Sequence, residues 1–348
     1  MQIRWIQLLE FRNYRSLSYR PSAKLNLLVG RNAQGKTNLL EGIAVLLVGR
    51  SFRTPRLAEL PRWGSPSASI AGEISRGDST RTLRRTLQQT ESGGWQAVGD
   101  HCEWARAIPF SWQDLAILTG GPGARRNFLD GFAGRLYPSH LAALVQYRKI
   151  LARRAVLLQK GQADRLAPWD EQLVTVGTEL LGRRRSATAA LQTELARIYP
   201  LLAGGPQKVE IRYRASLEAT DPGAFLAGLE RRRQEELRRG QTLVGPHRDD
   251  LLIELDGVDA RVYGSRGQQR LLALALRLAE VLPVAEATGT PPVLLLDDAL
   301  SELDAPGRAS VLAELRAAEQ VFLTTADAAF PAADGARWEV RAGDLVAA

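Results

Sequence analysis

The chain has 348 residues, of which 45% are hydrophobic and 24% charged, enough for two or three domains with a substantial core. No stretch approaches the roughly 20 consecutive apolar residues of a membrane-spanning helix, and the first residues alternate like a strand and not like a signal peptide. A single cysteine, Cys102, excludes an internal disulfide and a cysteine-based metal cluster. We therefore expect a soluble, cytoplasmic, mixed α/β protein.

Charge is distributed unevenly along the chain. The net charge is +7 over residues 1–118, +9 over residues 119–239 and −8 over residues 240–348. Arginine accounts for 41 of the 46 basic residues, and its planar fork suits bidentate contacts with phosphate. A GC-rich genome would explain the excess of arginine over lysine, but it would not explain the change of sign. A basic surface is typical of nucleic-acid-binding proteins.

The N-terminal third predicts strands around one buried helix. Residues 25–29 form a short apolar strand, Gly30 opens a turn, and residues 37–48 have the leucine and alanine content of a buried helix. Residues 50–110 mix short alternating segments with glycine, serine and proline turns, which favours an antiparallel and partly exposed sheet.

The middle of the chain predicts long helices. Ser139 is placed to cap a helix that ends at Gly161, a second helix spans residues 169–198 with Pro200 in its stop signal, and a third, charged helix lies near residues 222–239. No heptad pattern persists over three or four repeats, so these are bundle helices and not a long coiled coil.

Short strands return from residue 243, followed by a helix over residues 268–282 and an apolar strand over residues 292–296 that ends in two aspartates. Such a run predicts a buried parallel strand that delivers carboxylates at its C-terminal tip. The expected fold is therefore α/β: a P-loop ATPase head split into residues 1–118 and 240–348, with an α-helical arm domain inserted over residues 119–239.

Residues 30–37 fit the phosphate-binding pattern G-x-x-x-x-G-K-[ST], with a strand before and a helix after. In this pattern the glycine-rich loop wraps its N–H groups around a phosphate at the positive end of the helix. The lysine reaches the β- and γ-phosphates of a nucleotide, and the threonine hydroxyl binds Mg²⁺. The predicted nucleotide-binding residues are Gly30, Arg31, Asn32, Ala33, Gln34, Gly35, Lys36 and Thr37.

Asp297 and Asp298 supply the acids that such a site needs. We expect Asp297 to join Thr37 in holding Mg²⁺, and Asp298 to polarise the attacking water as a catalytic residue. The alternative interpretation is that the two acids only cap the following turn.

Residues 265–270 open the helix that precedes the acidic strand. Ser265 and Gly267 there could form an ordinary helix cap. They could instead bind the γ-phosphate of a nucleotide held by another subunit, as the signature loop of ABC-type ATPases does. The P-loop upstream and the acidic strand downstream, which has the form of an ABC-type Walker B followed by a D-loop, favour the second interpretation.

Together these motifs resemble the SMC-like branch of the ABC ATPases, and more narrowly the bacterial RecF family of recombination mediators. The match follows family order over nearly the whole chain, and it is carried by residues 9–14, 37–41, 49–53, 125–130, 245–251, 265–270 and 294–304. Only 227 residues separate Thr37 from Ser265, which leaves no room for the long coiled coil of other SMC-like proteins.

The resemblance implies an ATP- and Mg²⁺-dependent homodimer that binds DNA at gaps and at junctions between single strands and duplex. It also implies partnership with RecR and RecO in loading RecA, roles in repair, replication and the SOS response, and weak, DNA-linked ATP hydrolysis. By the same resemblance, Arg12, Asn13, Gln268 and Asp304 join Ser265 near the nucleotide, and Gln113 senses Mg²⁺ and water.

The sequence departs from the family pattern in three places. Ala33 replaces a usual P-loop glycine, which stiffens the loop without blocking it. Trp112-Gln113 replaces a common Pro-Glu pair. No histidine follows the acidic strand, and residues 321–326 occupy the usual switch position, which predicts slow hydrolysis.

Three arginine runs, at residues 153–154, 183–185 and 231–233, could be solvated helix faces or phosphate contacts. His247 is expected to be a structural turn residue in preference to a catalyst. Alternative functions for the whole chain are the ATP-binding subunit of a transporter, a P-loop kinase or GTPase, and a structural protein that has lost hydrolysis. No Asn-Lys-x-Asp guanine-reading motif is present, which disfavours GTP.

Overall fold

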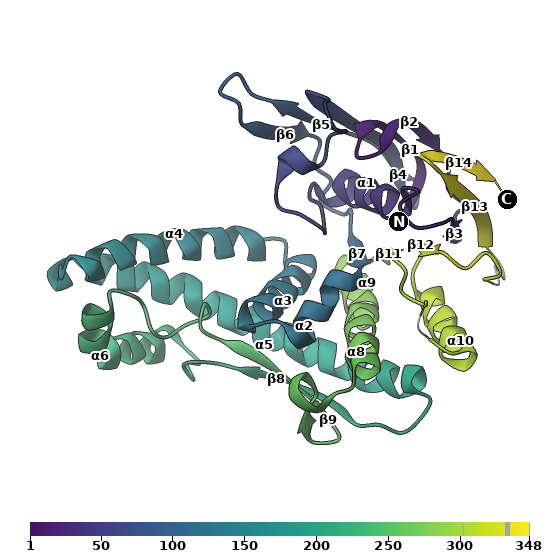
Figure 1. Ribbon diagram of the computed structural model, residues 1–348. Coiled ribbons are helices and arrows are strands. Elements are labelled where there is room, and N and C mark those ends of the chain that lie inside the picture. The colour runs from purple at the N-terminus through teal and green to yellow at the C-terminus, as the bar shows by residue number, and fades with distance from the viewer. Residues whose placement is uncertain (302, 331–334, 348) are drawn as a thin grey trace. The chain divides into compact units, whose positions relative to one another are not determined.

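A computed structural model describes the chain except for residues 302, 331–334 and 348 (Figure 1). The chain forms two compact units. The first contains residues 1–114, 201–204 and 274–348, and the second contains residues 115–200 and 205–273. The second unit thus continues past residue 239, where the sequence analysis placed the end of the helical arm. Within the described residues, no helix combines the length and apolarity needed to cross a membrane.

The first unit holds an antiparallel five-stranded sheet in the order β2-β1-β4-β5-β6. It confirms the expected antiparallel sheet within residues 50–110, which supplies three of its strands. The strands are β1 (Gln2–Phe11), β2 (Tyr14–Tyr19), β4 (Ser67–Arg76), β5 (Ser79–Gln89) and β6 (Trp95–Gly99).

The same unit holds a six-stranded sheet in the order β14-β13-β3-β12-β11-β7. Its strands pair in parallel except at the β13–β14 edge. The strands are β3 (Leu25–Val29), β7 (Ala107–Phe110), β11 (Val293–Leu296), β12 (Gln320–Thr325), β13 (Gly335–Arg341) and β14 (Asp344–Ala347). Every residue of β11 and β12 is buried. β11 is apolar throughout, as expected for a central parallel strand, whereas β12 also buries the polar residues Gln320, Thr324 and Thr325.

Helix α1 (Lys36–Val48) lies between the two sheets and contacts strands of both (Figure 1). Its leucine, isoleucine and valine side chains join one apolar core with residues from each sheet. The helix begins after Gly35 and ends at Gly49, both in the left-handed backbone region that glycine adopts without strain. The remaining helices of this unit are α9 (Val281–Thr288) and α10 (Ala305–Glu314).

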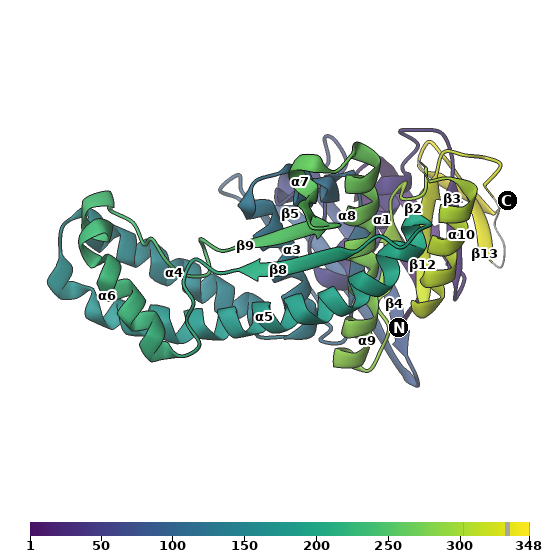
Figure 2. The same cartoon turned by 90° about the horizontal axis from the view of Figure 1, so that it is seen from below.

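The second unit is mainly helical. Figure 2 shows α4, α5 and α6 running alongside one another, and their facing side chains form a separate apolar core. A small antiparallel sheet in the order β10-β9-β8 completes the unit. The elements are α2 (Ala116–Thr119), α3 (Pro122–Leu136), α4 (His140–Gln159), α5 (Ala167–Ala203), β8 (Val209–Arg214), α6 (Pro222–Arg239), β9 (Asp250–Leu255), β10 (Val258–Asp259), α7 (Ala260–Tyr263) and α8 (Arg266–Leu278), whose last residues belong to the first unit.

Two helix boundaries differ from the sequence prediction, both at a proline. Helix α5 continues through Pro200 to Ala203, so this proline lies in the last turn of the helix and does not end it. The single helix predicted over residues 268–282 is instead α8 followed by α9. Pro283 lies near the start of α9, and its ring would clash with the carbonyl of Ala279 in a continuous helix.

Two arginines of the predicted charge runs are neither solvated nor free to contact phosphate. Arg154 is fully buried, and it donates to Asp170 at 2.5 Å, to Glu236 at 2.8 Å and to the Thr242 hydroxyl at 2.7 Å. Arg184 is likewise buried and binds a carboxylate of the same unit. Both expectations for these runs are therefore wrong at these two positions, where the arginines hold helices together.

Candidate nucleotide-binding site

The P-loop links β3 to α1 at the C-terminal edge of the six-stranded sheet. Two of its residues have positive φ: Gly35 at 119° and Ala33 at 66°. Gly35 is packed against Asn13 and Tyr14, so that no side chain fits there. At Ala33 the left-handed backbone conformation costs about 1–2 kcal/mol, because the residue has a Cβ atom. The departure at Ala33 therefore places a residue with a Cβ at a strained position of the loop.

The ammonium group of Lys36 lies in the loop, where it donates to the carbonyl oxygens of Gly30 at 2.6 Å and Arg31 at 3.0 Å. The residue is only 8% exposed. Burial lowers the pKa of Lys36, and the nearby carboxylates of Asp298 and Asp297 oppose that shift. No carboxylate of the described residues lies within ion-pair distance of the amine. A buried cation without an ion-pair partner is a suitable binding group for a phosphate.

Thr37, the next residue, contacts the acidic strand. Its hydroxyl lies 2.9 Å from each carboxylate oxygen of Asp297, and the Thr324 hydroxyl donates to the same carboxylate at 2.8 Å. The backbone N–H of Asp298 donates to Thr324 in turn, at 2.9 Å, with Asp298 itself at φ 50°. A hydroxyl and a carboxylate side by side are ligands that Mg²⁺ accepts beside phosphate oxygens.

The sheet order explains why these residues meet. Strands β3, β12, β11 and β7 are parallel neighbours, so their carboxyl ends lie along one edge. The P-loop follows β3, the threonines end β12, and the two aspartates follow β11. The crevice outside the carboxyl ends of parallel strands is where α/β proteins bind ligands. Residues about 260 positions apart in sequence thereby form one site.

A buried carboxylate that the sequence analysis did not single out organises the base of α1. Glu41 is fully buried and accepts from Arg12 through Nε and Nη2, both at 2.7 Å. It also accepts from the Ser51 hydroxyl at 2.5 Å and from Nη1 of Arg53 at 3.2 Å. The sequence signal was an acidic residue within the apolar part of the helix. Its consequence is that both arginines are bonded to α1, the helix that follows the P-loop.

A chain of amide hydrogen bonds continues from this cluster to the P-loop. Arg53 donates to Asn38 at 2.8 Å, Asn38 donates to Asn13 at 2.7 Å, and Asn13 donates to the carbonyl of Gln34 at 3.1 Å. The Tyr14 hydroxyl donates to the carbonyl of Gly35 at 3.0 Å. The loop between β1 and β2 is therefore bonded directly to the phosphate-binding loop.

A depression of about 670 Å³ adjoins the P-loop in the same unit, lined by Arg12, Asn13, Asn38 and Arg53. Trp63 and Trp95 also line it, and Trp63 is fully exposed. Arg12 and Asn13 therefore lie at the edge of this depression. Asn13 is also hydrogen-bonded to the P-loop, where the nucleotide site is predicted.

Gln113 follows β7 and is placed by a different contact. Its side-chain amide donates to the backbone carbonyl of Arg53 at 3.1 Å. Because β7 pairs with β11, the backbone N–H of Asp297 donates to the carbonyl of Phe110 at 2.9 Å, only three residues before Gln113. The structure brings Gln113 to the edge of the site but bonds it to a backbone group.

The other predicted nucleotide contacts are occupied by local hydrogen bonds. Ser265 and Gln268 form a reciprocal cap at the start of α8: the N–H of Ser265 donates to the Gln268 side chain at 2.9 Å, and the N–H of Gln268 donates to the Ser265 hydroxyl at 3.3 Å. Ser265 and Gly267 are nonetheless exposed. Asp304 caps α10 by accepting from the N–H of Gly307 at 2.9 Å. Residue 302, between the acidic strand and Asp304, lies outside the described residues.

These features define a class of protein. A P-loop between a parallel strand and a helix, an acid at the end of a neighbouring strand, and an antiparallel sheet packed on the same helix are the elements of an ABC-type ATPase head. Two solved Smc head domains share this fold: one bound to the C-terminal winged-helix domain of ScpA, with a TM-score of 0.59 at 16% identity, and one from Pyrococcus furiosus bound to the C-terminal domain of ScpA, with a TM-score of 0.57 at 15% identity. The expected fold class is therefore confirmed.

The particular family follows from closer relatives. The DNA replication and repair protein RecF of Anaeromyxobacter dehalogenans is 38% identical over 99% of this chain and 98% of its own length. RecF of Synechococcus sp. JA-3-3Ab is 37% identical over 93% and 91%, and RecF of Bacillus subtilis is 34% identical over 93% of each chain. The chain belongs to the RecF family of DNA replication and repair proteins.

Solved structures agree with this assignment. The recombination mediator protein RecF with ATP, of the RecFOR pathway, has a TM-score of 0.86 at 28% identity, and it covers 99% of this chain and 97% of its own. A second structure of the same mediator, with the ligand ATPrS, has a TM-score of 0.87 at 29% identity over 99% and 98%. A search against models of protein families finds no match.

Proposed function

We propose that this protein is an ATP-driven, DNA-binding homodimer of recombinational repair that works in the cytoplasm with RecO and RecR to load RecA, and that thereby supports SOS induction. Slow ATP hydrolysis resets the dimer. The proposal rests first on one observation: a buried lysine, which has no ion-pair partner among the described residues, lies beside a threonine hydroxyl and an aspartate that already contact each other.

Each residue of this site has a distinct role. Lys36 and the P-loop N–H groups bind the phosphates, while Thr37 and Asp297 hold Mg²⁺, which neutralises phosphate charge when it is bound. Asp298 orients the water that attacks the γ-phosphate. Gln113, at the same edge of the sheet, senses Mg²⁺ and this water. The fit is supported by the local chemistry, since a phosphate would supply the missing counter-charge for Lys36.

The dimer is proposed from the exposed start of α8. Ser265 and Gly267 are accessible there, beside Val262 and Tyr263, which are 68% and 73% exposed. Exposed apolar side chains around a polar cap are typical of a contact surface. In the dimer, Ser265 of one subunit closes on the γ-phosphate held by the other, and the Ser265–Gln268 cap is the form that this loop takes in the single chain.

DNA binding is supported by charge. Residues 1–118 and 119–239 carry net charges of +7 and +9, and DNA affinity is dominated by contacts with phosphate. Relatives of this chain are DNA replication and repair proteins, and a structural relative is a recombination mediator of the RecFOR pathway.

Sedimentation at fixed, modest salt tests the proposal, with and without ATP–Mg²⁺ and a short labelled gapped duplex. The expected result is a monomer that becomes a DNA-bound dimer only when ATP is present. Dimerisation without DNA binding would contradict the proposed DNA binding but would support the proposed ATP-driven dimer. A chain that stays monomeric with ATP and does not bind the duplex would contradict the whole proposal.

Three variants and one control variant separate the roles. Lys36→Ala should abolish nucleotide binding and with it the dimer. Ser265→Arg should bind nucleotide normally yet stay monomeric, whereas Ser16→Arg, at an exposed serine of β2, should dimerise like the wild type. Asp298→Asn should remain a DNA-bound dimer after ATP is supplied. If Ser265→Arg still dimerised with ATP, the site shared between subunits would be wrong.

A further inference from the structure

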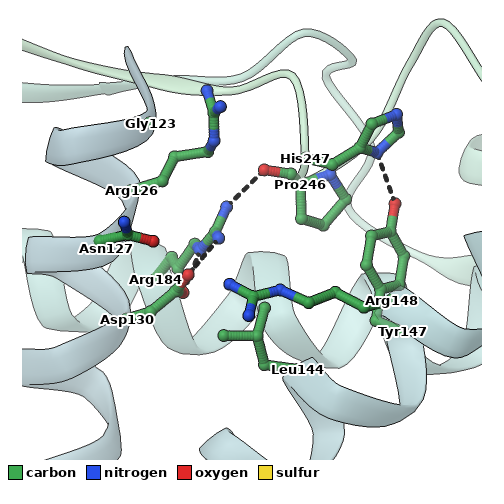
Figure 3. Close-up of a pocket in the computed structure, with 10 residues that line it drawn as sticks. All are labelled: Gly123, Arg126, Asn127, Asp130, Leu144, Tyr147, Arg148, Arg184, Pro246 and His247. Atoms are coloured by element: carbon green, nitrogen blue, oxygen red, sulfur yellow. Dashed lines mark hydrogen bonds and ion pairs between the residues drawn. The ribbon is translucent and has the colours of Figure 1, made fainter. Parts of the chain in front are cut away.

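Two sequence stretches that the nucleotide site does not use come together in the helical unit. Residues 125–130 lie on α3, and residues 245–251 form the turn before β9 and its first two residues. In the structure both line one pocket of about 200 Å³, together with side chains of α4 and α5 (Figure 3). The two stretches therefore contribute side chains to a single pocket.

The floor of the pocket is a rigid ion pair. Arg184 donates to both oxygens of Asp130, at 2.7 and 2.8 Å, and to the carbonyl of Pro246 at 2.6 Å, as Figure 3 shows. His140 binds the same carboxylate at 3.0 Å. Burial opposes ionisation of Asp130, but the bonds from His140 and Arg184 outweigh it and keep the pKa of the carboxyl below its usual value. The charge of Arg184 is thus neutralised within the floor.

His247 forms one wall of the pocket and is uncharged at neutral pH. It is bonded to the Tyr147 hydroxyl and to the carbonyl of Thr242, each at 3.1 Å. Burial is the main cause that lowers the pKa of His247 to about 4, and the nearby charge of Arg126 adds to the shift. This wall therefore adds no charge to the pocket.

Two further arginines face the pocket with their charges unneutralised. Within the described part of the chain, Arg126 makes one hydrogen bond, to the backbone carbonyl of Asp249 at 2.8 Å. The carboxylate of Asp249 is occupied by the Tyr213 hydroxyl and the N–H of Ser216. Arg148 is exposed, and among the described residues no carboxylate lies within ion-pair distance of it or of Arg126. The close-up shows the guanidinium of Arg148 directed toward the centre of the pocket.

The pocket therefore carries a net charge of about +2, from three arginines and one carboxylate. Gly123, in the first turn of α3, lines it as well, so the positive end of that helix adds to the field. Asn127 adds an exposed side-chain amide. Two arginine forks and an amide around a cavity of this size match a tetrahedral phosphate group.

We propose that this pocket binds a phosphate group of the DNA backbone, through Arg126, Arg148 and Asn127. The assignment rests on the proposed DNA binding and deepens it by naming one contact point. DNA is the source favoured over a free anion, because the pocket belongs to the part of the chain with the densest positive charge and its mouth carries an exposed arginine. Such a contact positions the protein without reading sequence.

The test compares Arg126→Gln and Arg148→Gln with Arg153→Gln, which removes the same charge from an exposed position of α4 outside the pocket. Affinity for a short duplex is measured with ATP–Mg²⁺ at several salt concentrations. Each pocket variant should bind about tenfold more weakly. The slope of log affinity against log salt should fall in magnitude by about 0.9, the value for one phosphate contact. Arg148→Lys, which keeps the charge but not the fork, should recover most of the slope.

The control separates a specific contact from a general loss of charge. Equal losses in Arg153→Gln and Arg148→Gln, or wild-type affinity in both pocket variants, would overturn the assignment. Thermal unfolding should stay close to the wild type in all variants, because none removes a bond of the Arg184–Asp130 floor and Arg126→Gln loses only the hydrogen bond to the carbonyl of Asp249. A wild-type chain that binds no DNA would refute the proposed function itself, which is a different outcome.

A titration with inorganic phosphate distinguishes a phosphate of the DNA backbone from a free phosphate ion as the ligand of this pocket. Phosphate is titrated against wild type and Arg148→Gln by calorimetry at constant ionic strength. If phosphate binds tightly to the wild type only, while both bind DNA equally, the pocket takes a free anion and the DNA assignment is wrong. Weak phosphate binding, together with the DNA effects above, supports it.

Discussion

Replacing Glu41 of α1 by glutamine removes the negative charge that pairs with Arg12 and Arg53. The carboxylate is fully buried and accepts two hydrogen bonds from Arg12, one from Arg53 and one from Ser51. Glutamine offers one acceptor oxygen and turns an NH₂ group toward a guanidinium. The variant thus loses charge and hydrogen bonds together, at a side chain that is itself fully buried.

The size of the effect follows from the exposure of the partners. Removing one member of a buried ion pair costs about 3–5 kcal/mol. The side chains of Arg12 and Arg53 are 17% and 33% exposed, so both regain some water, and we expect the lower value of about 3 kcal/mol. For a unit of 150–250 residues, this corresponds to a fall in Tm of about 6–12 °C.

Thermal unfolding followed by circular dichroism measures this change, with Glu59→Gln as the control. Glu59 pairs with Arg56 on the surface, their side chains being 42% and 80% exposed, and such a pair contributes at most about 1 kcal/mol. If Glu41→Gln and Glu59→Gln lowered Tm by the same amount, the reasoning that burial makes the Glu41 cluster strong would be refuted.

Three other changes are expected to have measurable effects. Ala33→Gly should raise the stability of the first unit by about 1 kcal/mol, seen as a small rise in Tm, because it relieves the left-handed strain at φ 66°; a fall in Tm would contradict the strain. Arg154→Met should lower Tm by about 6 °C or more, because Glu236 and Asp170 lose a buried cation, and Arg154→Met combined with Glu236→Met should recover much of that loss. His247→Gln should flatten the pH dependence of stability between about pH 6.5 and 4. Burial holds the histidine pKa at about 4 in the folded state, so only the unfolded chain binds a proton there, and wild-type stability falls as the pH falls through this window. An unchanged pH profile in that variant would show that His247 does not titrate in this way.

Local patterns were enough for the predictions that depend on neighbours in sequence. The helix predicted near residues 222–239 is confirmed as α6, because Asp221 caps it, Pro222 starts it and Gly240 ends it. The strand before the P-loop and the apolar strand before the two aspartates are confirmed for the same reason. Periodicity, caps and turn residues act over a few positions, and they can be read without knowing the fold.

Long-range partners explain what the sequence did not reveal. An arginine run looks the same whether its members point to water or, like Arg154 and Arg184, to buried carboxylates. The importance of Glu41 depends on arginines 12 positions away on one side and 29 on the other. Such pairing is decided only when distant segments pack together, because burial removes the water that would otherwise compete for each charge.

The sequence by itself determined the class of this protein, since the P-loop and its acidic strand are local patterns whose chemistry requires those residues. Only the tertiary structure decided which charges remain available for a ligand. The amine of Lys36 and the guanidiniums of Arg126 and Arg148 are without carboxylate partners among the described residues, whereas many other arginines of the chain are paired. Availability is a property of three-dimensional neighbours, and it is what distinguishes a binding group from a structural one.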